Sequence, residues 1–170
     1  PESGRCLPSL ISLIFSNDMR TIFFAGGCFW GTEHYLSLLD GVVETTVGYA
    51  NGNVENPSYQ QVYTDMTGHV ECVKVKYDDE IMTLETLCRL FFRSIDPLLE
   101  NRQGNDIGTR YRTGIYWTDD YDRHAVETVY TEVRNKYGKD LAVEIMPLKC
   151  FYPAEEYHQE YLVKNPDGYC

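Results

Sequence analysis

A single cysteine stands between two glycines and two aromatic residues in the stretch GGCFWGTEH, residues 26–34. This setting is typical of a reactive cysteine, because a helix that begins at Cys28 would favour the thiolate over the thiol. The helix dipole is worth roughly 0.3–1 kcal/mol, so other groups must supply further activation. The flanking Phe29 and Trp30 suit a small apolar pocket for a methyl group, or they anchor the helix to a sheet.

A second reactive group is predicted at Glu71, within the stretch HVECVKVKY at residues 69–77. This stretch alternates, which places Glu71 on the apolar face of a strand, while Lys74 and Lys76 mark the other face as exposed to solvent. Burial penalises the charged form of a carboxyl, so the pKa of Glu71 should rise and the group could act as a general acid. The alternative is a carboxylate paired with a buried arginine, for example Arg110 or Arg112.

Hydroxyl donors for the same site are available in two polar loops, which contain Tyr59 and Tyr111. A nucleophilic sulfur, a neutral acid and tyrosyl donors suit the reduction of a polarised X=O bond, in which the oxygen is protonated as the sulfur attacks. The main alternative is a cysteine hydrolase or acyltransferase that uses Cys28 with a histidine base. A non-enzymatic thiol redox sensor is a second alternative.

The elements that must position these groups alternate along the chain. Strands are predicted at Thr21–Phe24, Val42–Val47, 69–77, Gly114–Trp117 and, as the last strand, Ala142–Met146. Helices are predicted from Cys28 to about Leu39, behind the capping residue Thr83, at Asp120–Tyr137 and at Ala154–Val163, and long loops at Gly48–Gly68 and Asn101–Arg112. This order indicates an α+β fold, a two-layer α/β sandwich with a split β-α-β (ferredoxin-like) core and helices packed on a mixed sheet.

Length and composition limit the function further. The chain has 170 residues, and we interpret residues 1–19 as an unmatched leader and residues 20–170 as a single catalytic domain with a mobile tail. The net charge of −11 argues against nucleic acid and anionic membranes as partners. Six cysteines without a CxxC motif predict neither a disulfide scaffold nor a metal site. With no firm targeting signal, the expected compartment is the cytoplasm.

Five blocks of sequence in register carry a family resemblance. From about Arg20 to its end, the chain resembles the A-type peptide methionine sulfoxide reductases. The blocks are GGCFWGTE at 26–33, VGYANGNVENPSY at 47–59, TGHVE at 67–71, RQGNDIGTRYR at 102–112 and YPAEEYHQEYLVKNPDGYC at 152–170. The resemblance implies the two-layer split β-α-β fold and the reduction of methionine S-sulfoxide, both free and in proteins, as a repair of oxidative damage.

The resemblance also implies a role for each site residue. Cys28 would attack the sulfoxide sulfur and become a sulfenic acid, and Glu71 would protonate the sulfoxide oxygen. The remaining roles are holding that oxygen (Tyr59 and Tyr111), enclosing the substrate methyl group (Phe29 and Trp30) and orienting the substrate backbone or local water (Asp106).

Recycling of the sulfenic acid follows from the same resemblance. Cys170, in the motif NPDGYC, would condense with it to a disulfide, which thioredoxin would then reduce. The enzyme would need no cofactor other than this external dithiol. Some relatives carry a fused B-type reductase domain, so the full-length protein could include one.

Overall fold

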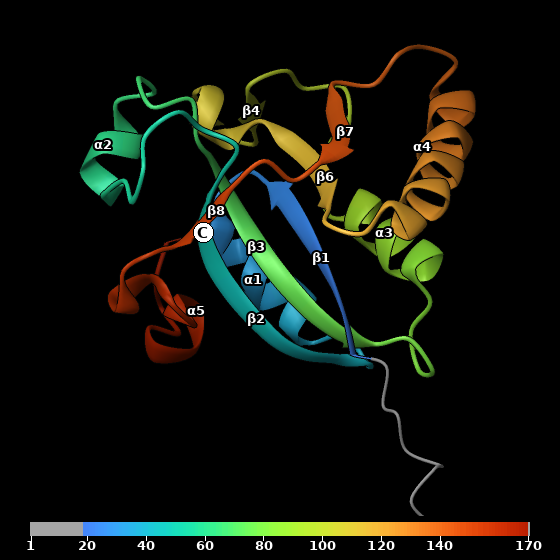
Figure 1. The fold of residues 1–170 in the computed structure, drawn as a ribbon. Helices are drawn as coiled ribbons and strands as arrows, with labels where there is room; N and C mark the ends of the chain where they lie inside the picture. The colour runs from blue at the N-terminus through green and yellow to red at the C-terminus, as the bar shows by residue number, and fades with distance from the viewer. Residues whose placement is uncertain (1–18, 170) are drawn as a thin grey trace, which may run out of the picture.

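The computed structural model describes residues 19–169, so Cys170 and all of the predicted leader except Met19 lie outside the described residues. Its centre is a six-stranded sheet with the strand order β7-β6-β1-β3-β2-β8 (Figure 1). The strands are β1 (Met19–Gly26), β2 (Val42–Ala50), β3 (Val70–Asp78), β6 (Thr113–Trp117), β7 (Val143–Pro147) and β8 (Phe151–Pro153). The β6–β7 pair is parallel and the others are antiparallel, which confirms the predicted mixed sheet.

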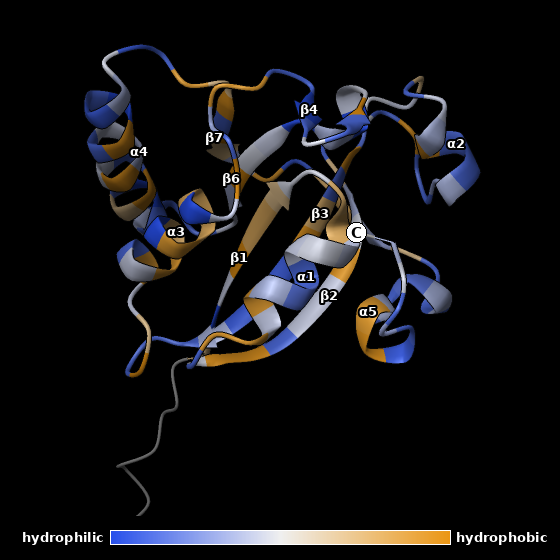
Figure 2. Ribbon diagram, turned by 180° about the vertical axis from the view of Figure 1, so that it is seen from behind, coloured by the Kyte–Doolittle hydropathy of each residue, from blue (hydrophilic) through white to orange (hydrophobic). Residues whose placement is uncertain are grey.

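Three longer helices cover one face of this sheet, as the view from behind shows (Figure 2). They are α1 (Phe29–Ser37), α3 (Leu84–Arg93) and α4 (Arg123–Tyr137). The shorter elements are α2 (Tyr59–Tyr63), the hairpin of β4 (Arg102–Gln103) and β5 (Asp106–Ile107), the 3₁₀ turns η2 (Thr109–Tyr111), η3 (Asp120–Asp122) and η4 (Glu156–His158), and α5 (Tyr161–Lys164). The α+β sandwich predicted from the sequence is therefore confirmed.

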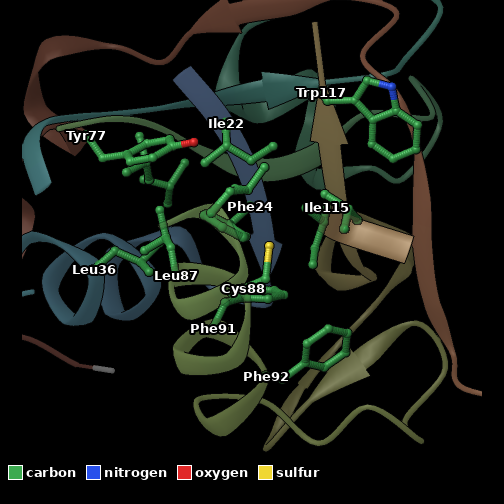
Figure 3. Close-up of a cluster of buried hydrophobic side chains, with 14 of the residues drawn as sticks. Ile22, Phe24, Leu36, Tyr77, Leu87, Cys88, Phe91, Phe92, Ile115 and Trp117 are labelled. Atoms are coloured by element: carbon green, nitrogen blue, oxygen red, sulfur yellow. The ribbon is translucent and has the colours of Figure 1, made fainter. Parts of the chain in front are cut away.

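The main core lies between the helices and the sheet (Figure 3). Thr83 caps α3 as predicted, because its Oγ1 accepts a hydrogen bond from the amide of Thr86 at 3.3 Å. The apolar stripe of α3 then packs on β1, where the rings of Phe91 and Phe24 stack at 4.7 Å between centroids. Cys88 on this stripe is fully buried.

The opposite face of the sheet was predicted to be exposed, and this prediction is wrong for one end of β3. Cys72 is fully buried there in a second cluster, together with Val70 and Tyr116. The chain between β7 and β8 crosses this face (Figure 1) and contributes Leu148 to the cluster. Only the far end, at Lys74 and Lys76, is partly exposed.

The predicted boundaries are least accurate in the loops and near the C-terminus. The loop predicted at 48–68 contains α2, whose first turn is held by a capping box between Ser58 and Gln61. A further strand, β8, follows the one predicted to be last and pairs with Gly48–Ala50 of β2. The helix predicted at Ala154–Val163 is instead η4 followed by α5. Within residues 19–169, no helix has the length and apolar character needed to cross a membrane.

Candidate active site

Cys28 lies at the junction of β1 and α1. It is the N-cap residue of α1 rather than its first helical residue, and it is half-buried. Thr32 holds this turn, because its Oγ1 donates to the carbonyl oxygens of Cys28 at 3.1 Å and Gly26 at 3.2 Å. Gly27 has φ of 87°, and a Cβ there would lie 2.6 Å from Cβ of Gln103. Glycine is therefore needed both for the turn and for the close approach of the β4–β5 hairpin.

Glu71 lies directly beside this turn. Its side chain points from β3 toward α1, and the amide of Phe29 donates a hydrogen bond to its Oε2 at 3.0 Å. The residue is only 2% exposed. Burial raises the pKa of Glu71 from 4.5 to about 8, although the Phe29 amide and the charge of Arg110 oppose this rise. A buried carboxyl with a raised pKa therefore lies beside the amide that follows Cys28.

Glu71 does not form an ion pair with either of the arginines suggested from the sequence. Arg110 instead pairs with Asp65, at 2.7 Å between Nη1 and Oδ2. Arg112 pairs with Glu144, at 3.0 Å between Nε and Oε1. The two guanidinium groups thus have carboxylate partners of their own, and Glu71 keeps its proton near neutral pH.

The two tyrosines lie within electrostatic range of Glu71. Tyr59 is the first residue of α2, and burial together with the charges of Glu71 and Cys28 raises its pKa to about 12. Tyr111 ends η2 and is 8% exposed, and burial and the charge of Glu71 raise its pKa above the ordinary value. Both phenols thus remain protonated near neutral pH and can donate hydrogen bonds. The structure brings Cys28, Glu71, Tyr59 and Tyr111 together from four separate segments.

Phe29 and Trp30 differ in their exposure. Phe29 is 1% exposed and packs in the main core, with its ring 5.9 Å from that of Tyr49. Trp30 is half-buried, and its indole stacks on Tyr161 of α5 at 3.7 Å with an interplanar angle of 12°. The Trp30 face therefore belongs to a wall built jointly by α1 and α5, while Phe29 also serves as a core anchor.

Asp106 and the tail both border a cleft beside Cys28. The cleft has a volume of about 530 Å³, and its walls include Cys28, Gln103, Asp106 and Tyr169. Gln103 holds the hairpin in place through two hydrogen bonds to the backbone of Asp96. Its Oε1 accepts from the Asp96 N–H at 2.9 Å, and its Nε2 donates to the Asp96 carbonyl oxygen at 2.7 Å. Tyr169, the last described residue, thus lies in the same cleft as the cysteine.

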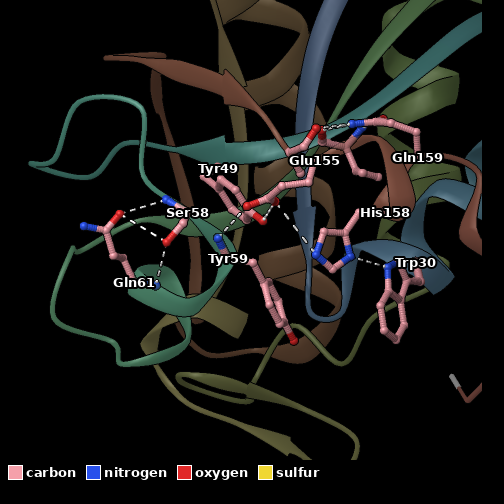
Figure 4. Close-up of polar contacts among 10 residues, drawn as sticks. Trp30, Tyr49, Ser58, Tyr59, Gln61, Glu155, His158 and Gln159 are labelled. Atoms are coloured by element: carbon pink, nitrogen blue, oxygen red, sulfur yellow. Dashed lines mark hydrogen bonds and ion pairs between the residues drawn. The ribbon is translucent and has the colours of Figure 1, made fainter.

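A partly buried polar network next to the site was not predicted from the sequence (Figure 4). Glu155 accepts hydrogen bonds from the amide of Tyr59 at 2.8 Å and the hydroxyl of Tyr49 at 2.7 Å. Its Oε2 also lies 3.9 Å from Nε2 of His158, whose Nδ1 accepts a hydrogen bond from the indole of Trp30 at 3.1 Å. One carboxylate thus links the start of α2 to the aromatic wall of the site. The sequence signal was the position of Glu155 and His158 in the block at 152–170.

Glu155→Gln is expected to destabilise the protein by about 1–2 kcal/mol. Burial alone would raise the pKa of Glu155, but the hydrogen bonds from Tyr49 and Tyr59 lower it below the ordinary value, so the charged form is the one that the fold stabilises. Urea unfolding measures the loss. Glu156→Gln is the matched control, because that side chain is 91% exposed. Equal stability of the two variants would contradict a structural role for Glu155.

Comparison with known proteins assigns this chain to a family. The profile described as peptide methionine sulfoxide reductase matches residues 20–170. The chain belongs to this family. The peptide methionine sulfoxide reductase MsrA of Clostridium botulinum is 54% identical over 153 residues, which cover 89% of this chain and 97% of that protein. The chain is therefore a thiol-dependent reductase of methionine sulfoxide, and the hydrolase and redox-sensor alternatives are set aside.

Solved structures agree with this assignment. The reduced form of Mxr1 from Saccharomyces cerevisiae superposes with a TM-score of 0.84 at 42% identity, covering 89% of this chain and 88% of that one. Mxr1 in complex with Trx2 superposes with a TM-score of 0.61 at 32% identity, covering 88% of this chain and 91% of that one. The match covers 97% of the Clostridium botulinum relative, so that relative gives no support for a fused B-type domain.

Proposed function

We propose that this enzyme reduces methionine S-sulfoxide, free and in proteins, with Cys28 as nucleophile and Glu71 as general acid. The observation that carries this proposal is the position of Glu71. It is buried on β3, and its carboxyl accepts a hydrogen bond from the amide of Phe29, the residue that follows Cys28. A carboxyl with a pKa of about 8 is protonated at neutral pH and is still acidic enough to give up its proton. Such a group suits protonation of a sulfoxide oxygen as sulfur attacks.

The sulfoxide step transfers one oxygen atom and two electrons. The Cys28 sulfur attacks the sulfoxide sulfur while Glu71 protonates the oxygen, and Tyr59 and Tyr111 donate hydrogen bonds to that oxygen. The attack forms a bond between the two sulfur atoms. The hydroxyl then passes from the substrate sulfur to the Cys28 sulfur as this S–S bond and the S–O bond of the substrate both break, so methionine leaves as the reduced thioether and Cys28 holds the oxygen as a sulfenic acid. Trp30 and Phe29 would enclose the substrate methyl group, and Asp106 would orient the substrate beside the cleft.

Recycling requires a second thiol and an external dithiol. Cys170 attacks the sulfenic acid, water leaves, and a Cys28–Cys170 disulfide forms. Thioredoxin then reduces this disulfide by thiol exchange and becomes oxidised. The position of Tyr169 in the Cys28 cleft and the Mxr1–Trx2 complex support this route. We place the reaction in the cytoplasm, where thioredoxin keeps thiols reduced, and assign the catalytic domain to residues 20–170.

Turnover of the two sulfoxide epimers tests the proposal. With dithiothreitol as reductant, the enzyme is expected to convert the S epimer of a methionine sulfoxide peptide to methionine and to leave the R epimer unchanged. Chiral chromatography of the substrate and product measures both reactions. Failure to consume the S epimer, or equal rates for the two epimers, would contradict the proposed specificity.

Cys170→Ser is expected to retain the chemical step and to lose recycling by thioredoxin. One equivalent of methionine per enzyme should form in a rapid burst, after which the steady-state rate with thioredoxin should fall at least about tenfold, because the sulfenic acid has lost the thiol that condenses with it. A quenched-flow assay measures the burst. Unchanged thioredoxin-driven turnover would identify another thiol as the recycling group.

A further inference from the structure

Arg110 is an arginine enclosed beside the candidate active site. Its guanidinium lies 4.3 Å from the ring centroid of Tyr63 and 4.4 Å from that of Tyr111. Only 10% of the side chain is exposed. Burying a guanidinium carries a large desolvation cost, which a well-placed carboxylate partner offsets. The contacts that hold it therefore need an explanation.

Asp65 fixes this guanidinium in place. Its Oδ2 accepts from Nη1 of Arg110 at 2.7 Å, and its Oδ1 accepts from the amide of the same residue at 3.0 Å. A Cβ at Gly108, where φ is 147°, would lie 2.7 Å from both Nη1 of Arg110 and Oδ2 of Asp65. Glycine at this position thus lets the ion pair close, and the charge of Arg110 is held at one point.

The positive charge of Arg110 affects the pKa values of the groups proposed to react. Burial raises the pKa of Glu71 to about 8, and the charge of Arg110 pulls it down while that of Asp106 pushes it up. Arg110 likewise lowers the pKa values of Tyr59 and Tyr111, against burial and the charge of Glu71. The groups that interact with Glu71 come from several elements: the Phe29 amide of α1, Tyr49 of β2, Tyr59 of α2, Asp106 of β5, and Arg110 and Tyr111 of η2.

We infer that Arg110, held by Asp65, is a positioning residue for the sulfoxide step and stabilises the Glu71 carboxylate that proton transfer creates. This inference rests on the proposed function of Glu71 as the acid. When Glu71 gives its proton to the sulfoxide oxygen, a negative charge appears at a side chain that is 2% exposed. Because water cannot solvate that charge, a fixed cation nearby stabilises the charged state directly.

Arg110→Gln is expected to shift the alkaline limb of kcat/KM upward by about one pH unit and to lower the plateau about tenfold. The first effect follows because Glu71 holds its proton more tightly without the cation, and the second because a weaker acid transfers that proton more slowly. Arg110→Lys, which keeps the charge, should restore the limb toward that of the unmodified enzyme. A purely structural role would change the plateau without moving the limb.

Asp65→Asn should shift the alkaline limb of kcat/KM in the direction opposite to that of Arg110→Gln. This variant keeps the guanidinium and removes its counter-charge, so the alkaline limb should move to lower pH. Arg123→Gln is the matched control, because it neutralises an arginine that is 57% exposed on α4 and pairs with Glu127 there. Its limb and plateau should equal those of the unmodified enzyme.

The outcomes separate this inference from the proposed function. An unmoved limb in Arg110→Gln, or shifts of the same sign in both variants, would overturn the role of Arg110 while the unmodified enzyme still reduces the S-sulfoxide. If Arg110→Gln does not fold, as judged by circular dichroism, the Asp65→Asn limb decides alone. A downward shift then supports the inference, and an unmoved or upward one overturns it. An inactive unmodified enzyme would instead refute the proposed function.

Discussion

Replacing Cys28 by serine is expected to reduce the formation of methionine from S-sulfoxide to the uncatalysed level. A serine hydroxyl stays protonated at neutral pH and is a much weaker nucleophile than a thiolate. It also has no accessible sulfenic state, so the oxygen has no acceptor. A single-turnover assay with excess enzyme measures the loss, because it does not depend on any recycling step.

The matched control for this substitution is Cys150→Ser. Cys150 is also half-buried, and its Sγ lies 3.6 Å from the carbonyl oxygen of Gly52, near β8. This variant should retain both the burst and the steady-state rate. Methionine formation by Cys28→Ser in the burst would remove Cys28 from the role of nucleophile, whatever the other cysteines do.

Glu71→Gln should slow the sulfoxide step by about 10²–10⁴-fold, the range typical of a lost general acid. Glutamine keeps the size of the side chain and an oxygen that can accept from the amide of Phe29, but it has no acidic proton. In the unmodified enzyme, kcat/KM should fall as pH rises through about 8, where Glu71 ionises. The variant should lose this limb, and a full pH profile measures both effects.

A buried carboxyl outside the site serves as the control. Glu33 of α1 is also 2% exposed, burial raises its pKa, and it accepts hydrogen bonds from Thr45 and from the amide of Glu160. Glu33→Gln should therefore retain the alkaline limb and most of the rate. An alkaline limb that persists in Glu71→Gln would show that another group titrates there.

Glu71→Gln should also stabilise the protein at neutral and alkaline pH. The pKa of Glu71 is raised in the folded state, so between about 4.5 and about 8 the unfolded chain has lost this proton and the folded chain still holds it. The stability contributed by the neutral carboxyl therefore declines as pH rises through this window. Glutamine does not titrate, so the stability advantage of the variant in urea should grow from about pH 5 to about pH 8.

Local sequence was sufficient to predict the chemistry of the two central residues. The Gly-Gly-Cys turn before an amphipathic helix places a thiol at a helix N-terminus, and the strict alternation of 69–77 places Glu71 on a buried face. Both features depend on short-range geometry, since the turn requires glycine at position 27 and side chains alternate along any strand. For the same reason the capping residue Thr83 was predicted correctly.

Other features depend on contacts between residues distant in the sequence. Whether a face of β3 is buried depends on what crosses it, so Cys72 lies in a second core although Lys74 shares its face. Arg110 meets Asp65 across 45 positions, and Glu155 meets Tyr59 across 96. The periodicity of the sequence carries no information on such pairs, because a charged residue in a loop gives the same sequence pattern whether its partner is water or a partly buried carboxylate. These charged groups lose water only when the sheet, α2 and the C-terminal segment pack together, and this desolvation strengthens their electrostatic interactions.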